Sequence, residues 1–224
     1  MIRRLEIPWP VGLQGGLDVQ AFRVLAVSDE IDPALEFPEV RRSLGRIDLV
    51  VGCGDLDPGY LAMLGDAFMA PLHFVHGNHD RGLGWSEHRH VLPEALVDGK
   101  PVRVGSIRLA GFNWPGPRDG RADRDDLGAW VQVMRLAFRL IGRGRQPLLL
   151  ISHVPPAGTG DVPSDRYHRG FRAYDWLARH LRPPLWLHGH SPLAACPSPI
   201  DRLGPTCVVN VTGATLVELQ PVAA

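Results

Sequence analysis

Four polar clusters along this chain carry the side chains that could do chemistry. Residues 76–80 read HGNHD, which puts an amide, an imidazole and a carboxylate at consecutive positions. The other clusters are Gly54-Asp55, Ser152-His153 and Gly189-His190. Each cluster follows a short apolar run of the kind that forms a buried strand. Because ligands of α/β proteins bind at the carboxyl ends of parallel strands, the four clusters predict one composite site.

The donor atoms of these clusters indicate a metal site. The strand-end residues are Asp29, Asp55, Asn78, His79, His153, His188 and His190. Their carboxylate oxygens and imidazole nitrogens suit Mn, Fe or Zn better than calcium or a thiolate zinc site. An isolated histidine is more often structural, and an isolated aspartate after a strand is more often a helix cap. Their joint occurrence favours metal binding, with His76 and His188 as structural or supporting groups.

Composition argues against several other classes of protein. The 224 residues include 24 basic and 24 acidic side chains, so no net charge favours nucleic acid or an anionic membrane as a partner. No segment reaches the roughly 18 apolar residues that a membrane helix requires. Three cysteines without a C-x-x-C pair indicate a reducing compartment, and we expect a cytoplasmic protein. The length favours a single domain over residues 1–224.

The apolar runs and the segments between them predict alternating strands and helices. Strands buried on both faces are expected at 22–27, 47–51, 72–76, 148–152 and 185–188. Helices are expected at 37–44, 60–68, 123–141 and 170–181. Two pairs of runs flank turns, which predicts antiparallel strands at 102–104 with 107–111 and at 207–211 with 215–219. This order indicates an α/β fold, largely parallel, with more than one sheet.

The helix at 123–141 has the clearest apolar periodicity. Its apolar side chains recur at three- and four-residue steps and are Leu127, Trp130, Val131, Met134, Ala137, Phe138 and Ile141. Asp123 is available as the N-cap and Gly142 as the stop. We expect this stripe to face the core.

The order of the polar clusters resembles that of the calcineurin-like metallophosphoesterases. The blocks of that family run D-x-H, G-D, G-N-H-[DE], a lone His after a strand, and G-H-x-H. Here they are Asp29-Glu30-Ile31, Gly54-Asp55, Gly77-Asn78-His79-Asp80, His153 and Gly189-His190-Ser191-Pro192, and the resemblance spans residues 22–216. It implies two mixed β-sheets packed face to face and flanked by helices, in an α/β/β/α sandwich.

The resemblance also implies metal-dependent hydrolysis of a small phosphomonoester or phosphodiester by hydroxide that the metal activates. In the family, one metal takes the bridging Asp, the Asn, the lone His and the first His of G-H-x-H. All four are present here as Asp55, Asn78, His153 and His190. The resemblance therefore implies one strong site for a divalent transition metal.

The second metal position of the family is depleted in this chain. It takes both residues of D-x-H, the bridging Asp and the last His of G-H-x-H. Of these ligands Asp29 and Asp55 remain, whereas Ile31 and Pro192 cannot coordinate. A weak second ion is expected there. Either carboxylate beside Ile31, in Glu30 or Asp32, is an alternative oxygen donor, although both also fit a solvated strand end.

The remaining site residues would act on the substrate. The resemblance places His79 near the leaving oxygen, as proton donor or charge stabiliser, with Asp80 orienting its ring. Arg81 follows this block, where it would pair with a phosphate oxygen or remain solvated. His168 and Arg169 precede the helix expected at 170–181, whose first backbone amides attract anions.

Two functions from different classes fit these residues. The first is metal-dependent phosphoester hydrolysis. The second, motivated by the losses at Ile31 and Pro192, is a degenerate relative that binds a metal or a nucleotide for regulation without turnover. Nucleic-acid processing is weakened by the balanced charge and by the lack of a basic run. The substrate depends on loops that carry no general code, and the sequence leaves the oligomeric state open.

Overall fold

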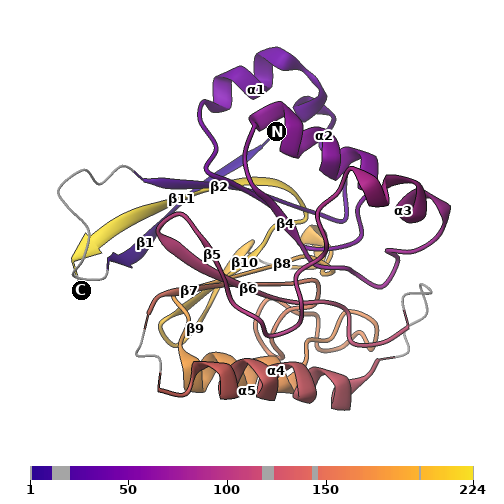
Figure 1. Ribbon diagram of the computed structural model, residues 1–224. Helices are drawn as coiled ribbons and strands as arrows, with labels where there is room; N and C mark the ends of the chain where they lie inside the picture. Colours follow the sequence, from indigo (N-terminus) through magenta and orange to yellow (C-terminus); the bar gives the residue numbers. More distant parts are fainter. Residues whose placement is uncertain (1, 12–20, 118–123, 143–145, 197, 224) are drawn as a thin grey trace.

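The strands form two mixed β-sheets (Figure 1). The computed structural model describes residues 2–11, 21–117, 124–142, 146–196 and 198–223. One sheet has the order β1-β11-β2-β3-β4, with β1 (Arg3–Val11), β2 (Phe22–Ser28), β3 (Leu49–Gly52), β4 (Leu72–Phe74) and β11 (Gly213–Ala223). The other has the order β5-β6-β7-β8-β10-β9, with β5 (Val102–Val104), β6 (Ile107–Phe112), β7 (Leu148–Ser152), β8 (Leu185–His188), β9 (Ile200–Leu203) and β10 (Thr206–Asn210).

Helices cover the outer face of each sheet, which confirms the expected sandwich (Figure 1). The five-stranded sheet is covered by α1 (Pro38–Leu44) and α2 (Pro58–Phe68), with α3 (Leu83–Glu87) beside them. The six-stranded sheet is covered by α4 (Asp126–Leu140) and α5 (Arg172–Leu181). Short 3-10 turns are η1 (Pro33–Glu36), η2 (His88–His90) and η3 (Leu193–Ala195). Among the described helices, none combines the length and apolar character that crossing a membrane requires.

Alternation along the strands divides the core into three layers. Val24 of β2 and Leu187 of β8 lie between the two sheets. Their neighbours point the other way, since Leu25 packs with α1 and α2 and Trp186 packs with α4 and α5. Successive side chains of a strand face opposite sides, so a strand buried on both faces must be apolar throughout. This is why the predicted runs at 148–152 and 185–188 coincide with β7 and β8.

Two strands were not expected from the sequence, and one expected pairing is wrong. β1 and β9 are edge strands, and their prolines and charged residues hide the strand pattern. The pair at 102–104 and 107–111 is antiparallel as expected. The pair at 207–211 and 215–219 is not, because β10 pairs with β8 and β9 while β11 pairs with β1 and β2. The chain crosses from one sheet to the other at Val211 and Thr212.

The predicted core stripe of α4 faces outward. The residues that α4 buries against the sheet are Ala129, Gln132, Val133 and Leu136, whereas Phe138 of the predicted stripe is 65% exposed. Gln132 is buried because its amide bonds Tyr174 and the backbone of residue 113. Because Gln132 is polar, the apolar pattern of the sequence does not identify the face of α4 that packs on the sheet. Asp125, not the expected Asp123, caps the helix, and Asp123 lies outside the described residues.

The loops after β3 and β4 are joined by the buried carboxylate of Asp80. Its oxygens accept hydrogen bonds from the backbone N–H groups of Gly77 (2.7 Å), Asp55 (2.9 Å) and Leu56 (3.2 Å). Burial raises the pKa of Asp80 to about 6, although the N–H groups of Gly77 and Asp55 favour the ionised form. The side chain therefore fixes the backbone that carries Asp55 and Asn78.

Asp80→Ala should destabilise the fold more than the loss of an ordinary helix cap. It leaves three backbone N–H groups without their acceptor, and we expect the free energy of unfolding to fall by about 3 kcal/mol. Asp57→Ala is the matched control, because Asp57 accepts a single cap bond from Tyr60 at 2.9 Å. Its loss should cost about 1 kcal/mol. Urea unfolding at neutral pH measures both, and equal losses would contradict the structural role of Asp80.

Candidate metal centre

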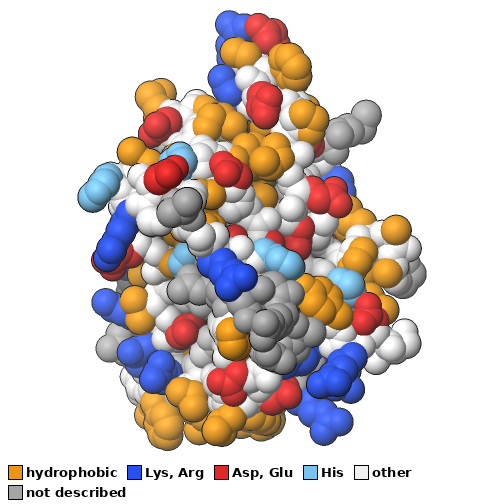
Figure 2. Space-filling model, turned by 90° about the vertical axis from the view of Figure 1, so that its right-hand side faces the viewer, with side chains coloured by type: hydrophobic (Ala, Val, Ile, Leu, Met, Phe, Trp, Pro, Cys, Tyr) orange, Lys and Arg blue, Asp and Glu red, His pale blue; other side chains and the backbone are white. Residues whose placement is uncertain are grey.

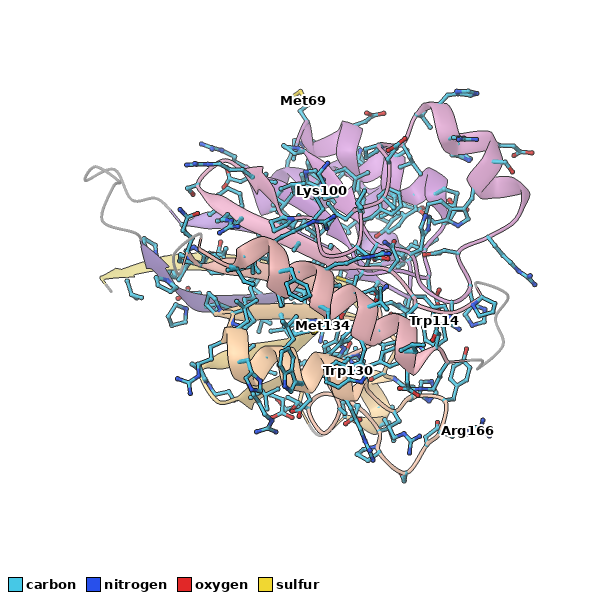
Figure 3. All side chains as sticks on the ribbon, turned by 60° about the horizontal axis from the view of Figure 1, so that its bottom comes forward. Met69, Lys100, Trp114, Trp130, Met134 and Arg166 are labelled. Atoms are coloured by element: carbon cyan, nitrogen blue, oxygen red, sulfur yellow. The ribbon has the colours of Figure 1, made fainter. Side chains whose placement is uncertain are left out.

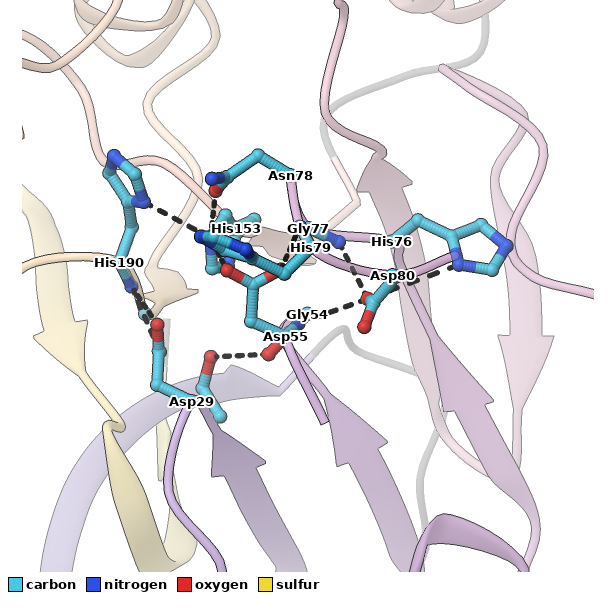
Figure 4. A network of polar contacts seen from close by, with 12 residues as sticks. Asp29, Gly54, Asp55, His76, Gly77, Asn78, His79, Asp80, His153 and His190 are labelled. Atoms are coloured by element: carbon cyan, nitrogen blue, oxygen red, sulfur yellow. Dashed lines mark hydrogen bonds and ion pairs between the residues drawn. The ribbon is translucent and has the colours of Figure 1, made fainter. Parts of the chain in front are cut away.

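All five predicted ligands meet where the two sheets join (Figure 4). Asp29, Asp55 and Asn78 follow β2, β3 and β4, which are parallel neighbours in the five-stranded sheet. His153 and His190 follow β7 and β8, which are parallel neighbours in the six-stranded sheet. Each sheet therefore delivers its strand-end residues to one edge. Packing of the two sheets brings these edges together.

Three of these residues have a left-handed backbone. The φ angle is 60° at Asp29, 54° at Asp55 and 64° at His190. In the described part of the chain, the other non-glycine residues with positive φ are Met69 and Arg182, which are helix C-caps. A cap explains the conformation of the latter two. No cap explains the left-handed backbone of Asp29, Asp55 and His190. At non-glycine residues this conformation is strained, and it is concentrated at functional sites, where the surrounding structure holds it in place.

Two glycines of the motifs allow the carboxylates to approach the backbone. A Cβ atom at Gly77 would overlap the carboxylate of Asp55, and one at Gly189 would overlap that of Asp29. The close contact at Gly189 lets the backbone N–H of His190 donate to Oδ2 of Asp29 at 2.9 Å. Close packing at these two positions therefore excludes any larger residue.

Three donor atoms surround Nε2 of His153. Oδ1 of Asn78 lies 3.0 Å from it, Oδ2 of Asp55 lies 3.1 Å away and Nδ1 of His190 lies 3.1 Å away. Ligands held at about 2.1 Å from one ion are themselves about 3 to 3.5 Å apart. Within the described residues, Asp55, His153 and His190 also form a potential metal-binding group whose ligand atoms lie within 4.8 Å of one another.

Backbone carbonyl groups set the tautomers of both histidines. The Nδ1–H of His153 donates to the carbonyl oxygen of Cys53 at 2.9 Å, which leaves Nε2 to face the other donors. The Nε2–H of His190 donates to the carbonyl oxygen of Tyr167 at 2.9 Å, which leaves Nδ1 to face them. Such contacts orient metal-binding imidazoles and raise their basicity.

The electrostatics of the cluster call for a cation. Burial lowers the pKa of His153, but the carboxylates of Asp55 and Asp29 more than reverse this effect and raise it to about 9. Burial and then the charge of His153 lower the pKa of His190 to about 3. Burial raises the pKa of Asp55, yet the charge of His153 and the hydrogen bonds from His153 and from the backbone of His79 together outweigh it, and the net shift is downward. One positive charge therefore belongs among these groups, carried by a proton or a metal ion.

The donor set fits a divalent metal. It offers one carboxylate oxygen, one amide oxygen and two imidazole nitrogens, and the other three atoms lie within 3.1 Å of Nε2 of His153. The side chains of Asn78, His153 and His190 are buried, and that of Asp55 is 11% exposed. Buried groups of this kind are stable when they share a cation.

The second metal position is not assembled in the same way. Both carboxylate oxygens of Asp29 accept from the N–H of His190, and Oδ2 also accepts from Thr212 Oγ1 at 3.3 Å. Ile31 is 45% exposed, and Pro192 offers no donor. The alternative donors differ as well: Asp32 caps η1 through the N–H of residue 34, whereas Glu30 lies at the edge of the site.

The structure changes the expected roles around His79. The ring of His79 is exposed, and its Nε2 lies 2.9 Å from the hydroxyl of Tyr167. Asp80 does not orient this ring, because its carboxylate is occupied by backbone N–H groups. An ion-pair contact links that carboxylate to His76, whose Nδ1 is 3.9 Å from it (Figure 4). In this structure Asp80 therefore supports His79 through the backbone of its loop.

Tyr167 is a site residue that the sequence analysis missed. Its hydroxyl accepts a hydrogen bond from Nδ2 of Asn78 at 2.7 Å and contacts His79, while its carbonyl oxygen holds His190. It lies in the loop between β7 and α5, directly before His168. The only available signal was that position, because a tyrosine matches no ligand pattern.

An open hollow of about 420 Å³ adjoins the donor atoms. Its lining includes Asp29, Glu30, Asp55, His79, Tyr167, His168, His190, Ser191, Pro192 and Thr212. His168 therefore faces the site, with its Nδ1 in contact with the carboxylate of Asp165. Arg169 is exposed and does not line this hollow, and Arg81 lines a neighbouring one with His76 and Trp85. Of the three predicted substrate contacts, the structure brings His168 to the site.

Comparisons with known proteins agree with this geometry. The sequence model of the calcineurin-like phosphoesterase family matches residues 22–193. No curated protein matches significantly. TT1561 of Thermus thermophilus shares the fold with a TM-score of 0.58 and 17% identity, over 87% of this chain and 90% of that one. A phosphopantetheinyl hydrolase, PptH, from Mycobacterium tuberculosis has a TM-score of 0.51 and 12% identity, over 86% and 89%. With its ordered motifs gathered at one metal-fitting centre, this chain belongs to the calcineurin-like phosphoesterases.

Proposed function

We propose that the protein hydrolyses a phosphomonoester or phosphodiester at this centre. The observation that carries the proposal is the convergence of Asp55, Asn78, His153 and His190 beside an open hollow. A divalent ion bound there would polarise a phosphoryl oxygen and lower the pKa of a bound water towards about 7. The nitrogen and oxygen donors suit Mn, Fe or Zn, with one tightly held ion and a weak second one.

His79 is the proposed proton donor to the leaving oxygen. Its exposed ring lines the hollow, and its backbone N–H donates to Oδ1 of Asp55 at 2.7 Å, which keeps the ring beside the donor cluster. The Tyr167 hydroxyl, 2.9 Å from Nε2, puts an oxygen where a leaving oxygen would meet the ring. Positioned acids of this type contribute about 10²- to 10⁴-fold to rates. Asp80 supports His79 through the backbone only.

The substrate is proposed to be a small molecule with a phosphoester group. The modest hollow and the polar residues around it support this, and His168 is the proposed contact to the part beyond the phosphorus. One solved protein with the same fold is a phosphopantetheinyl hydrolase, so a phosphopantetheinyl ester belongs in the substrate panel. Three free cysteines support a reducing cytoplasm as the location.

A regulatory protein without turnover is the second candidate. The observation in its favour is the state of Asp29, whose carboxylate lines the hollow but accepts hydrogen bonds from His190 and Thr212. Two-metal members of such families clamp both the attacking and the leaving oxygen. A chain that keeps one position would still bind a metal or a nucleotide.

Removal of a metal ligand should separate these two functions. With added Mn²⁺, the wild type should cleave an activated aryl phosphate ester, and Asp55→Ala or His153→Ala should lower kcat/KM by at least about 100-fold. His90→Ala, which removes an exposed histidine outside the donor cluster, is the matched control and should retain full activity. Turnover that is equal in all variants rules out the proposed centre. Mn²⁺ binding without turnover on a broad panel, the phosphopantetheinyl ester included, favours the regulatory function.

Metal affinity should rise with pH. Without metal, His153 carries a proton up to a pKa of about 9, and an ion must displace that proton to reach Nε2. Protons compete best at low pH, so the apparent Kd for Mn²⁺ should fall by up to about tenfold per pH unit between about pH 6.5 and 8.5. Calorimetry in two buffers of different ionisation enthalpy should detect release of about one proton. A pH-independent Kd would contradict this electrostatic picture.

A further inference from the structure

Tyr167 contacts the donor cluster through both its side chain and its backbone. The phenol oxygen lies 2.7 Å from Nδ2 of Asn78 and 2.9 Å from Nε2 of His79. The carbonyl oxygen lies 2.9 Å from Nε2 of His190. One residue from a loop thus touches two of the four candidate ligands and the proposed proton donor.

The phenol determines which end of the Asn78 amide faces His153. The oxygen and the nitrogen of an amide have nearly the same shape, so packing alone does not distinguish them. The hydrogen bond from Nδ2 to the phenol leaves Oδ1 pointing at Nε2 of His153, 3.0 Å away. Without that bond, the amide can turn over and present its N–H₂ group to the metal position. An N–H₂ group cannot coordinate a cation.

The loop that carries Tyr167 is itself held in place. The carboxylate of Asp165 accepts from the backbone N–H of Tyr167 at 2.9 Å and also contacts the ring of His168. The carboxylate of Asp161 accepts from the N–H of Gly158 at 3.0 Å and from that of Gly170 at 2.8 Å. These bonds close the loop on itself, so the phenol and the carbonyl oxygen keep a fixed place above the donors.

We propose that Tyr167 is the positioning residue of the metal centre, because it fixes the Asn78 amide and the His190 tautomer in the orientation that binds a metal. This inference rests on the proposed function and specifies how its site is preorganised. Groups that orient metal ligands typically change metal affinity by 10- to 100-fold when they are removed.

The test measures the affinity for Mn²⁺ rather than turnover. Tyr167→Phe removes the phenol and keeps the carbonyl contact to His190, so the Kd should rise about tenfold. Tyr174→Phe is the matched control, because it removes a buried phenol that donates to Gln132 at 2.7 Å, away from the hollow. Its Kd should match that of the wild type. Circular dichroism should show that both variants are folded.

A second background tests the mechanism. In Asn78→Asp, both side-chain oxygens can coordinate, so the orientation no longer matters and adding Tyr167→Phe should change the Kd less than about twofold. An equal loss in both backgrounds overturns the inference, as does an unchanged Kd in Tyr167→Phe alone. Both of these results leave the proposed function standing. Wild type that binds no Mn²⁺ overturns both.

The outer face of α4 carries an independent inference. Its apolar side chains follow a spacing of four, three and four residues, and their exposed fractions are Leu127 74%, Val131 42%, Met134 38% and Phe138 65%. Ile141, the C-cap residue of α4, follows three residues later and is 71% exposed. Figure 3 shows Met134 and Trp130 along the side of α4 next to α5, and Trp130 also packs against Trp176 of α5, with ring centroids 5.7 Å apart. Figure 2 shows apolar side chains gathered along the lower edge of the molecule, where Figure 1 places α4 and α5.

This spacing is the seam of a helix that packs against another helix. A 3.5-residue repeat keeps one apolar line facing a partner helix, whereas contact with a sheet uses a wider face. The sheet-facing contacts of α4 are already made by Ala129, Val133 and Leu136. Large aromatic residues and Met, here Trp130, Met134 and Phe138, are enriched in protein interfaces.

The charges at the two ends of α4 favour the same helix as its partner. Asp125 and Asp126 lie at its N-terminal end, and Arg135 and Arg139 lie in its C-terminal half. An antiparallel pair of α4 helices brings the acidic end of each copy to the basic end of the other. A parallel pair would bring like charges together. Met134 lies midway along this seam, seven residues from both Leu127 and Ile141, so the two Met134 side chains of an antiparallel pair would lie nearest the twofold axis.

We infer that two copies of this chain associate through antiparallel α4 helices. Sedimentation or light scattering should show a dimer for the wild type and a monomer for Met134→Glu, which places a charge on the twofold axis. Met69→Glu is the matched control, because Met69 is 93% exposed at the end of α2, and this variant should remain dimeric.

A charge exchange tests the direction of the helices. Asp126→Lys should weaken the dimer. Asp126→Lys with Arg139→Glu should restore it, because residue 126 of one copy and residue 139 of the other again carry opposite charges. A wild type that stays monomeric at its highest soluble concentration overturns the inference. A dimer that survives Met134→Glu, or a seam occupied by a different protein while the chain itself is monomeric, also overturns it.

Discussion

The contact between His153 and Asp55 is the interaction on which the site depends, because it joins the two sheets. Nε2 of His153, after β7, lies 3.1 Å from the carboxylate of Asp55, after β3. The other nitrogen of the same ring donates to the carbonyl oxygen of Cys53 at 2.9 Å. Apolar side chains between the sheets, such as Val51 and Ile151, hold the two strands face to face. The core that stabilises the sandwich thus also assembles the donor cluster.

Burial explains why this cluster keeps its charge and why its two halves differ. A carboxylate and two imidazoles withdrawn from water are stable only with a shared cation, and this condition fits the preserved position. Asp29 is stabilised by hydrogen bonds instead. Its oxygens accept from the N–H of His190 and from Thr212, so it supports the backbone of His190.

Sequence patterns succeeded wherever a residue's own strand or motif decided its place. The runs at 148–152 and 185–188 were found because strands buried on both faces must be apolar. Sequence patterns fail where a contact with a residue far along the chain decides the position of a side chain. Gln132 is buried only because its amide forms hydrogen bonds with Tyr174 and with the backbone of residue 113. The apolar stripe of α4 therefore predicts the wrong core-facing side of the helix. The strands at 207–211 and 215–219 look like a hairpin, but each finds its neighbours in a different sheet.

The donor types, their position at strand ends and the inability of Ile31 and Pro192 to coordinate a metal can all be read from the amino-acid sequence. Which atoms face one another follows from the packing of the two sheets. The tertiary structure gave His153 and His190 their tautomers and brought Tyr167 to Asn78 across 89 positions of the chain. The physical reason is that periodicity fixes the direction of a side chain relative to its own element. The distance between elements depends on how the whole core packs.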